Sequence, residues 1–190
     1  MERHPRITPR ITTRDMAIIP IFSVLTALGA FIKLPLGPVP VSMQMVFVVL
    51  SGILLGKKAL YSQLIYVLLG LMGLPIFTGG GGIGYILTPT FGYLVGFILA
   101  AFTIGSLREK MKSITVLKLF LISFIGVIVI YLCGAGYLYL LKNVILGNSP
   151  LSLFNALKFG ALVFLPGDTL WCLFAAFLGK RLTKEIPLLK

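Results

Sequence analysis

The chain has few of the side chains that enzymes most often use for chemistry. Its 190 residues include five acids, one histidine and two cysteines. The histidine, His4, lies in a basic amino-terminal segment, and Cys133 and Cys172 lie apart inside apolar segments without a CxxC pattern. General acid–base catalysis usually needs two positioned groups, and no paired carboxylates are evident. We therefore predict that the chain is not an enzyme and holds no metal or cofactor of its own.

Charged residues are also scarce, at 12% of the chain, which is about half the fraction typical of a soluble domain. Hydrophobic residues make up 58%, and the mean hydropathy is +1.04. This composition predicts an integral membrane protein without a separate soluble domain. The net charge of +12 need not indicate nucleic acid, because the lysines and arginines cluster between apolar segments as membrane topology signals do. We expect the lipid bilayer, and no nucleic acid, as the partner of this charge.

Six apolar segments predict an all-α membrane domain over residues 15–182, between a basic tail at 1–14 and another at 183–190. The predicted spans are about 16–34, 41–56, 59–74, 90–107, 115–141 and 166–182. An even number of spans puts both tails on one side, and 14 of the 17 lysines and arginines then lie on that side. The positive-inside rule predicts that both termini are cytoplasmic and that the chain crosses the plasma membrane several times.

Two unusual loops fall on the predicted outer side. The segment at 33–40 contains three prolines and a glycine within six residues, which excludes a helix, and it predicts a lid or a re-entrant segment. The segment at 76–89 contains five glycines in six residues, without the Lys-Ser/Thr of a phosphate-binding loop. Its glycines predict a close approach of the backbone to a ligand or a neighbouring helix, with a merely flexible loop as the alternative.

Asp168 is the only acid inside an apolar segment. A carboxylate at membrane depth costs about 3 kcal/mol unless it faces a cavity or a partner. Because Pro166 and Gly167 precede it, Asp168 can cap the start of the last helix, or it can face a cavity and bind a ligand. Both loops share the outer side with this residue, which favours a ligand pocket there.

Other polar or aromatic residues in the spans have two open interpretations. Gln44 can bond a neighbouring helix or face the solute. Tyr93 and Trp171 can be interfacial anchors or can stack on a ligand.

Four motifs, in this order, resemble the BioY family, the biotin-specific S components of energy-coupling-factor (ECF) transporters. They are GPVPVSMQ at 37–44, GLMGLPIF at 70–77 with the glycine run after it, PTFGYLVGF at 89–97 and LPGD at 165–168. The resemblance covers about 15–182. It implies a six-helix S-component fold and a substrate-binding subunit of an ATP-driven importer, most simply for biotin. It also implies a transmembrane T subunit and two cytoplasmic ATPases as partners, which would use the ATP.

The resemblance also implies roles for individual residues. Asp168 matches the aspartate that contacts the ligand, Gln44 and the 36–44 loop match the lid, and Tyr93 matches the aromatic residue of the family's PTGGY motif. The candidate substrate-binding residues are Asp168, Gln44, Tyr93, Trp171, Thr78, Gly80 and Val39.

Three positions depart from the family pattern. Trp171 stands where the family typically has a lysine, a natural partner for the carboxylate of biotin. Lys33, Lys158 or backbone N–H groups are the alternatives that could substitute for it. Phe91 stands in place of a glycine, which predicts a narrower pocket. Ser23 and Ala27 are the nearest match to the AxxxA pattern that packs on the T subunit. Another vitamin such as lipoate therefore remains an alternative, as does a solitary secondary transporter and, less favoured, a membrane enzyme.

Overall fold

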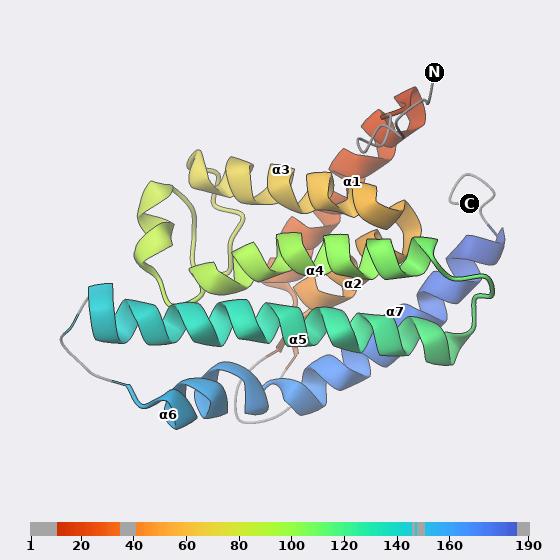
Figure 1. Ribbon diagram of the computed structural model, residues 1–190. Coiled ribbons are helices and arrows are strands. Elements are labelled where there is room, and N and C mark those ends of the chain that lie inside the picture. The colour runs from red at the N-terminus through yellow and green to blue at the C-terminus, as the bar shows by residue number, and fades with distance from the viewer. Residues whose placement is uncertain (1–10, 35–40, 146, 148–150, 186–190) are drawn as a thin grey trace, which may run out of the picture.

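The computed structural model describes residues 11–34, 41–145, 147 and 151–185, and these form a helical bundle (Figure 1). The α-helices are α1 (Thr13–Phe31), α2 (Gln44–Leu55), α3 (Ala59–Leu71), α4 (Phe91–Glu109), α5 (Val116–Leu140), α6 (Leu153–Leu157) and α7 (Leu165–Glu185). Short 3-10 turns are η1 (Gly56–Lys58) and η2 (Ile83–Leu87), and π-helical turns are η3 (Leu141–Ile145) and η4 (Lys158–Leu162). The all-α prediction is confirmed for the described residues, apart from two strands of two residues each.

Those strands flank the proline-rich loop. Strand β1 (Lys33–Leu34) pairs antiparallel with β2 (Val41–Ser42), with Lys33 opposite Ser42 and Leu34 opposite Val41. The pairing holds the two ends of the loop together at the start of α2. Residues 35–40, and with them the predicted contact Val39, lie outside the described residues.

Helices α2 and α3 fold back on each other. Gly56 ends α2 with φ +61°, a conformation that glycine adopts without a steric cost. The amide of Gln44 donates a hydrogen bond of 2.7 Å to the hydroxyl of Tyr66, although one continuous helix would separate these residues by about 33 Å. The two helices are therefore antiparallel.

Five helical stretches are long and apolar enough to cross a membrane, whereas the sequence predicted six spans. They are Thr13–Phe31, Gln44–Leu71, Phe91–Glu109, Val116–Ile145 and Leu153–Glu185. The second combines α2 and α3, which have 12 and 13 residues and are each too short to be counted separately. The last is longer than the predicted 166–182, because α6 and η4 lead into α7 with helical backbone.

The surface of the bundle has the apolar character of a membrane protein. Ile21, Val24 and Leu28 are exposed along α1, and exposed leucines and phenylalanines continue over α5 and α7. Small and polar side chains lie inside instead, including Ser23, whose hydroxyl donates to the carbonyl of Ser62 at 2.7 Å. This distribution is expected where lipid, not water, surrounds the helices.

Helices α4 and α5 lie side by side along the bundle, and α7 crosses beneath them (Figure 1). The amino-terminal halves of α2 and α4 and the start of α7 face one end of the bundle, where the β1–β2 hairpin and the η2 segment also lie. The start of α1, the η1 turn and the end of α4 meet at the other end. The two ends therefore present different sets of side chains.

Candidate functional site

A cavity of about 380 Å³ opens at the end of the bundle that holds the hairpin and the η2 segment. Its size falls within the range of small-molecule pockets. Its lining residues come from four α-helices (α2, α4, α5 and α7), the η2 and η4 turns, strand β2 and the segments between them: Ser42, Gln44, Met45, Thr78, Tyr85, Pro89, Thr90, Tyr93, Leu94, Phe97, Ile130, Tyr131, Leu138, Phe159, Phe164 and Asp168. The structure thus brings Thr78 and Tyr85 of the glycine-rich segment close to Asp168, together with Ser42, which follows the proline-rich loop. The predicted place of residues 35–40 beside this cavity lies outside the described residues.

Asp168 lies in the first turn of α7 and is only 5% exposed. Its backbone N–H donates to the carbonyl of Phe164 at 3.0 Å, so the helix has already begun before it. Its carboxylate accepts a hydrogen bond of 2.6 Å from the hydroxyl of Tyr131 across the bundle. Asp168 is therefore not the N-cap residue of α7, which starts at Leu165, although it is an acid of the first turn; its side chain turns toward α5 and the cavity.

Tyr131 is a polar site residue that sequence reasoning missed. It lies in α5, faces the cavity and is nearly buried, so its hydroxyl needs a partner. The hydrogen bond to Oδ2 of Asp168 supplies that partner and leaves Oδ1 as a further acceptor. The sequence offered little sign of this pairing, because Tyr131 lies in a long apolar segment outside any of the motifs.

Gln44 bonds a neighbouring helix, as one of its two interpretations predicts, and its contact with a solute stays a prediction. Its amide nitrogen donates to Tyr66 of α3, and its amide oxygen accepts from the hydroxyl of Ser42 at 3.3 Å. Gln44 and Ser42 also both line the cavity. The hydrogen bond to α3 thus holds the amide in place at the edge of the site.

Tyr93 lies inside the bundle, which favours the ligand-facing interpretation over an interfacial anchor. Its hydroxyl donates to the carbonyl of Gly160 at 2.5 Å, and its ring lies against Gly134, where a β-carbon would come within 2.4 Å of the ring. These contacts fix the ring as one wall of the cavity.

The glycine-rich segment contributes less than the sequence suggested. Thr78 lines the cavity, and its hydroxyl lies 3.3 Å from that of Tyr85, which also accepts from Thr90 at 2.9 Å. Gly80 is not among the lining residues. A β-carbon on Gly81 would lie 2.1 Å from the carbonyl oxygen of Leu74, so this glycine permits a close approach to the segment that follows α3. A close approach of the other glycines to a ligand stays a prediction.

Two aromatic residues lie outside the cavity lining. Trp171 packs edge-on against Phe174, with ring centroids 6.1 Å apart, and it does not join Asp168 in the site. The buried face of α7 passes instead through Asp168 and Cys172, with Trp171 beside it. Phe91 packs against Tyr137 at 5.6 Å and does not narrow the cavity.

The predicted docking pair on α1 is divided between two environments. Ser23 is buried and bonded to α3, whereas Ala27 is half-buried against the core. The exposed face of α1 is formed by larger side chains, including Ile21 and Val24. The role of Ser23 and Ala27 in docking stays a prediction.

The lining of the cavity suits ligand binding better than catalysis. Its walls are mainly apolar and aromatic, with hydroxyls and one amide placed among them. Among the described residues that line it, Asp168 alone is charged, and none is a histidine or a cysteine. Such a lining recognises a small solute with an apolar body and hydrogen-bond donors. Fold and site together define a membrane-embedded solute-binding protein.

Comparison with known proteins identifies its family. The model of the BioY family matches residues 3–188, and the chain belongs to this family. A probable biotin transporter BioY of Lysinibacillus sphaericus is 44% identical over 174 residues, which are 91% of this chain and 88% of that protein. The biotin transporter BioY of Thermotoga maritima is 40% identical over 168 residues, 86% of this chain and 92% of that protein.

A solved structure agrees with these relatives. The crystal structure of the S-component for biotin from an ECF-type ABC transporter superposes with a TM-score of 0.79 and 27% identity. The match covers 93% of this chain and 96% of that chain. The relatives are transporters and the solved structure is a transporter component, in agreement with the prediction that this chain is not an enzyme.

Proposed function

We propose that this chain binds biotin in the cavity beside Asp168 and is the substrate-binding S component of an ECF-type importer. The observation that carries the proposal is the carboxylate itself. It is buried, it is bound only by a tyrosine hydroxyl among the described residues, and it faces a cavity large enough for a vitamin. The family membership and the names of its relatives support the same ligand.

The cavity lining suggests how biotin would lie. Biotin combines a ureido ring with two N–H donors, an apolar thioether ring and a chain that ends in a carboxylate. Oδ1 of Asp168 would accept from a ureido N–H, and Tyr93 and Phe97 would pack against the apolar part. The biotin carboxylate would point away from Asp168, because two like charges repel at short range.

The proposed assembly and topology follow the family. The S component would dock on a transmembrane T subunit with two cytoplasmic ATPases, so ATP would be used by those partners and not by this chain. With α1, α2, α3, α4, α5 and α7 as six crossings, both termini would be cytoplasmic and the cavity would open outward at the plasma membrane. The clustering of 14 of the 17 lysines and arginines on the terminal side supports this orientation.

Ligand binding by the purified chain tests the substrate. We expect saturable binding of biotin with one site per chain, and weak or no binding of lipoate, which lacks the ureido donors for Asp168. Lipoate is the alternative vitamin to test, because Trp171 stands where the family typically has a lysine for the carboxylate of biotin. Saturable binding of lipoate, with none of biotin, would overturn the assignment.

Uptake into proteoliposomes tests the assembly. Biotin uptake should require the T subunit, the ATPases and ATP in addition to this chain. Undiminished uptake by this chain alone, without ATP, would instead identify a solitary secondary transporter.

A further inference from the structure

A second cavity, of about 340 Å³, lies at the end of the bundle away from Asp168. It is formed by the start of α1, the end of α2 with the η1 turn, and the end of α4, and we call it the basic-end cavity. Its lining residues are Thr12, Arg14, Asp15, Ile18, Ile53, Leu54, Leu55, Gly56, Lys58, Arg108 and Glu109. Charged and apolar side chains thus share one cavity, unlike the mainly apolar lining around Asp168.

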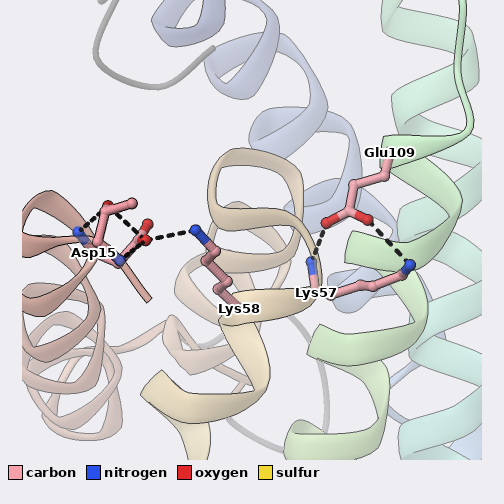
Figure 2. A network of polar contacts seen from close by, with 5 residues as sticks. Asp15, Lys57, Lys58 and Glu109 are labelled. Carbon is pink, nitrogen blue, oxygen red and sulfur yellow. Dashed lines mark hydrogen bonds and ion pairs between the residues drawn. The ribbon is translucent and has the colours of Figure 1, made fainter. Parts of the chain in front are cut away.

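Both carboxylates of this cavity are already bound by lysines (Figure 2). Oδ2 of Asp15 accepts from Nζ of Lys58 at 2.5 Å and also from the backbone N–H and the hydroxyl of Thr12. Oε1 of Glu109 accepts from the backbone N–H of Lys57 at 2.9 Å, and Oε2 lies 3.3 Å from Nζ of the same lysine. The two acids are therefore neutralised by the turn that connects α2 to α3.

The two arginines of the cavity differ from its lysine in their partners. Within the described part of the chain, neither Arg14 nor Arg108 forms an ion pair. Both side chains are half-buried, and Nε of Arg108 is closed to solvent without a hydrogen-bond partner there. A guanidinium that lines a cavity without a counter-charge can bind an anion with several oxygens through its outer N–H groups.

We propose that the basic-end cavity binds the phosphate of an anionic phospholipid through Arg14 and Arg108. Arginine matches phosphate oxygens with its planar set of donors, and basic pockets between membrane helices are suited to lipid headgroups. The apolar part of the lining, Ile18, Ile53, Leu54 and Leu55, favours a lipid over free phosphate. It offers a surface for the glycerol and the first acyl carbons, which inorganic phosphate does not have.

Lipid retention by the purified full-length chain, measured by native mass spectrometry, tests the proposal. The probes are phosphatidylglycerol and phosphatidylcholine with the same acyl chains, and inorganic phosphate is added as a competitor. We expect one phosphatidylglycerol per chain to bind more tightly than phosphatidylcholine. Arg14→Gln and Arg108→Gln should each weaken phosphatidylglycerol binding by about fivefold. Arg181→Gln, which removes an exposed arginine of α7 outside the cavity, is the matched control and should leave binding unchanged.

Three results would overturn the proposal. The first is equal retention of phosphatidylglycerol by the wild type and both cavity variants. The second is equal retention of the two lipids by the wild type, and the third is displacement of the lipid by inorganic phosphate, which would make the site one for the free ion. Because a variant can lose lipid by misfolding, Arg108→Lys is measured beside Arg108→Gln. It keeps the charge and should recover part of the binding while melting at the same temperature as Arg108→Gln.

Discussion

At one end of the bundle Asp15 and Glu109 each bind a lysine, whereas at the other end Asp168 is bound by the hydroxyl of Tyr131. No lysine or arginine is found among the described residues that line the cavity around Asp168. A carboxylate paired with lysine has its charge balanced within the chain. A buried carboxylate held by one neutral hydroxyl still has acceptor capacity, which it can offer to a ligand. The difference separates acids that hold the fold together from the acid that serves the site.

The largest effect is expected at Asp168. Asp168→Asn keeps the size of the side chain but removes the charge and one acceptor, so we expect biotin affinity to fall by about 10- to 100-fold. Titration calorimetry on the purified variant measures this loss. Glu109→Gln is the matched control, since it removes a carboxylate from the other end of the bundle and should leave affinity unchanged. Equal affinity of Asp168→Asn and wild type would contradict a ligand role for the charge.

A smaller effect is expected at Tyr131. Tyr131→Phe removes the 2.6 Å hydrogen bond and keeps the ring, so Asp168 should lose its fixed orientation and biotin affinity should fall by about fivefold. In the Asp168→Asn background the same change should cost less, because the two residues act through one contact. Additive losses in the double variant would show that Tyr131 acts on the ligand independently of Asp168.

The ion pair of Lys58 should affect stability and not binding. The side chains of Lys58 and Asp15 are 23% and 14% exposed, so the pair is partly shielded from water. Lys58→Met keeps much of the chain length, and we expect it to lower the free energy of unfolding by about 1 kcal/mol. Unfolding in detergent measures the change, and biotin affinity measured in parallel should stay constant. A fall in biotin affinity at unchanged stability would contradict the proposal that the ion pairs at this end stabilise the fold and do not take part in binding.

The smallest effect is expected at Lys57. Its side chain and that of Glu109 are 42% and 44% exposed, and such pairs contribute little because water and salt screen them. Lys57→Met should lower the free energy of unfolding by less than about 0.5 kcal/mol, and the loss should shrink further at high salt. A loss as large as that of Lys58→Met would mean that burial does not distinguish the two pairs.

Much of the fold could be predicted from the sequence, because membrane helices leave a strong signal in composition. The apolar segments and the glycine and proline breaks located most of the helices. The reversal between α2 and α3 was predicted by the break at Gly56. The hydrogen bond that joins the two helices, between Gln44 and Tyr66, was not, because residues 22 positions apart leave no local pattern. The extension of α7 backward through α6 was missed, because residues 151–165 are only partly apolar and their helical backbone depends on packing.

The site was predictable to the extent that polar residues stand out in an apolar chain. Asp168, Gln44, Tyr93 and Thr78 were all expected in the site, and all line the cavity. Tyr131 was missed because a tyrosine in a long apolar helix has no distinctive pattern. Trp171 was included by its position three residues after Asp168, but helix α7 turns that side chain toward Phe174. The sequence order of a motif thus identified the helix turn without giving the direction of each side chain.

The structure of this chain with biotin bound tests the central claim most directly. The distance to measure is that between Oδ1 of Asp168 and the nearest ureido nitrogen of the ligand. We predict a hydrogen bond of about 3 Å, with the biotin carboxylate pointing away from Asp168 and Tyr131 still bound to Oδ2. Biotin bound outside the cavity, or bound in it with no ureido nitrogen in contact with Asp168, would contradict the account.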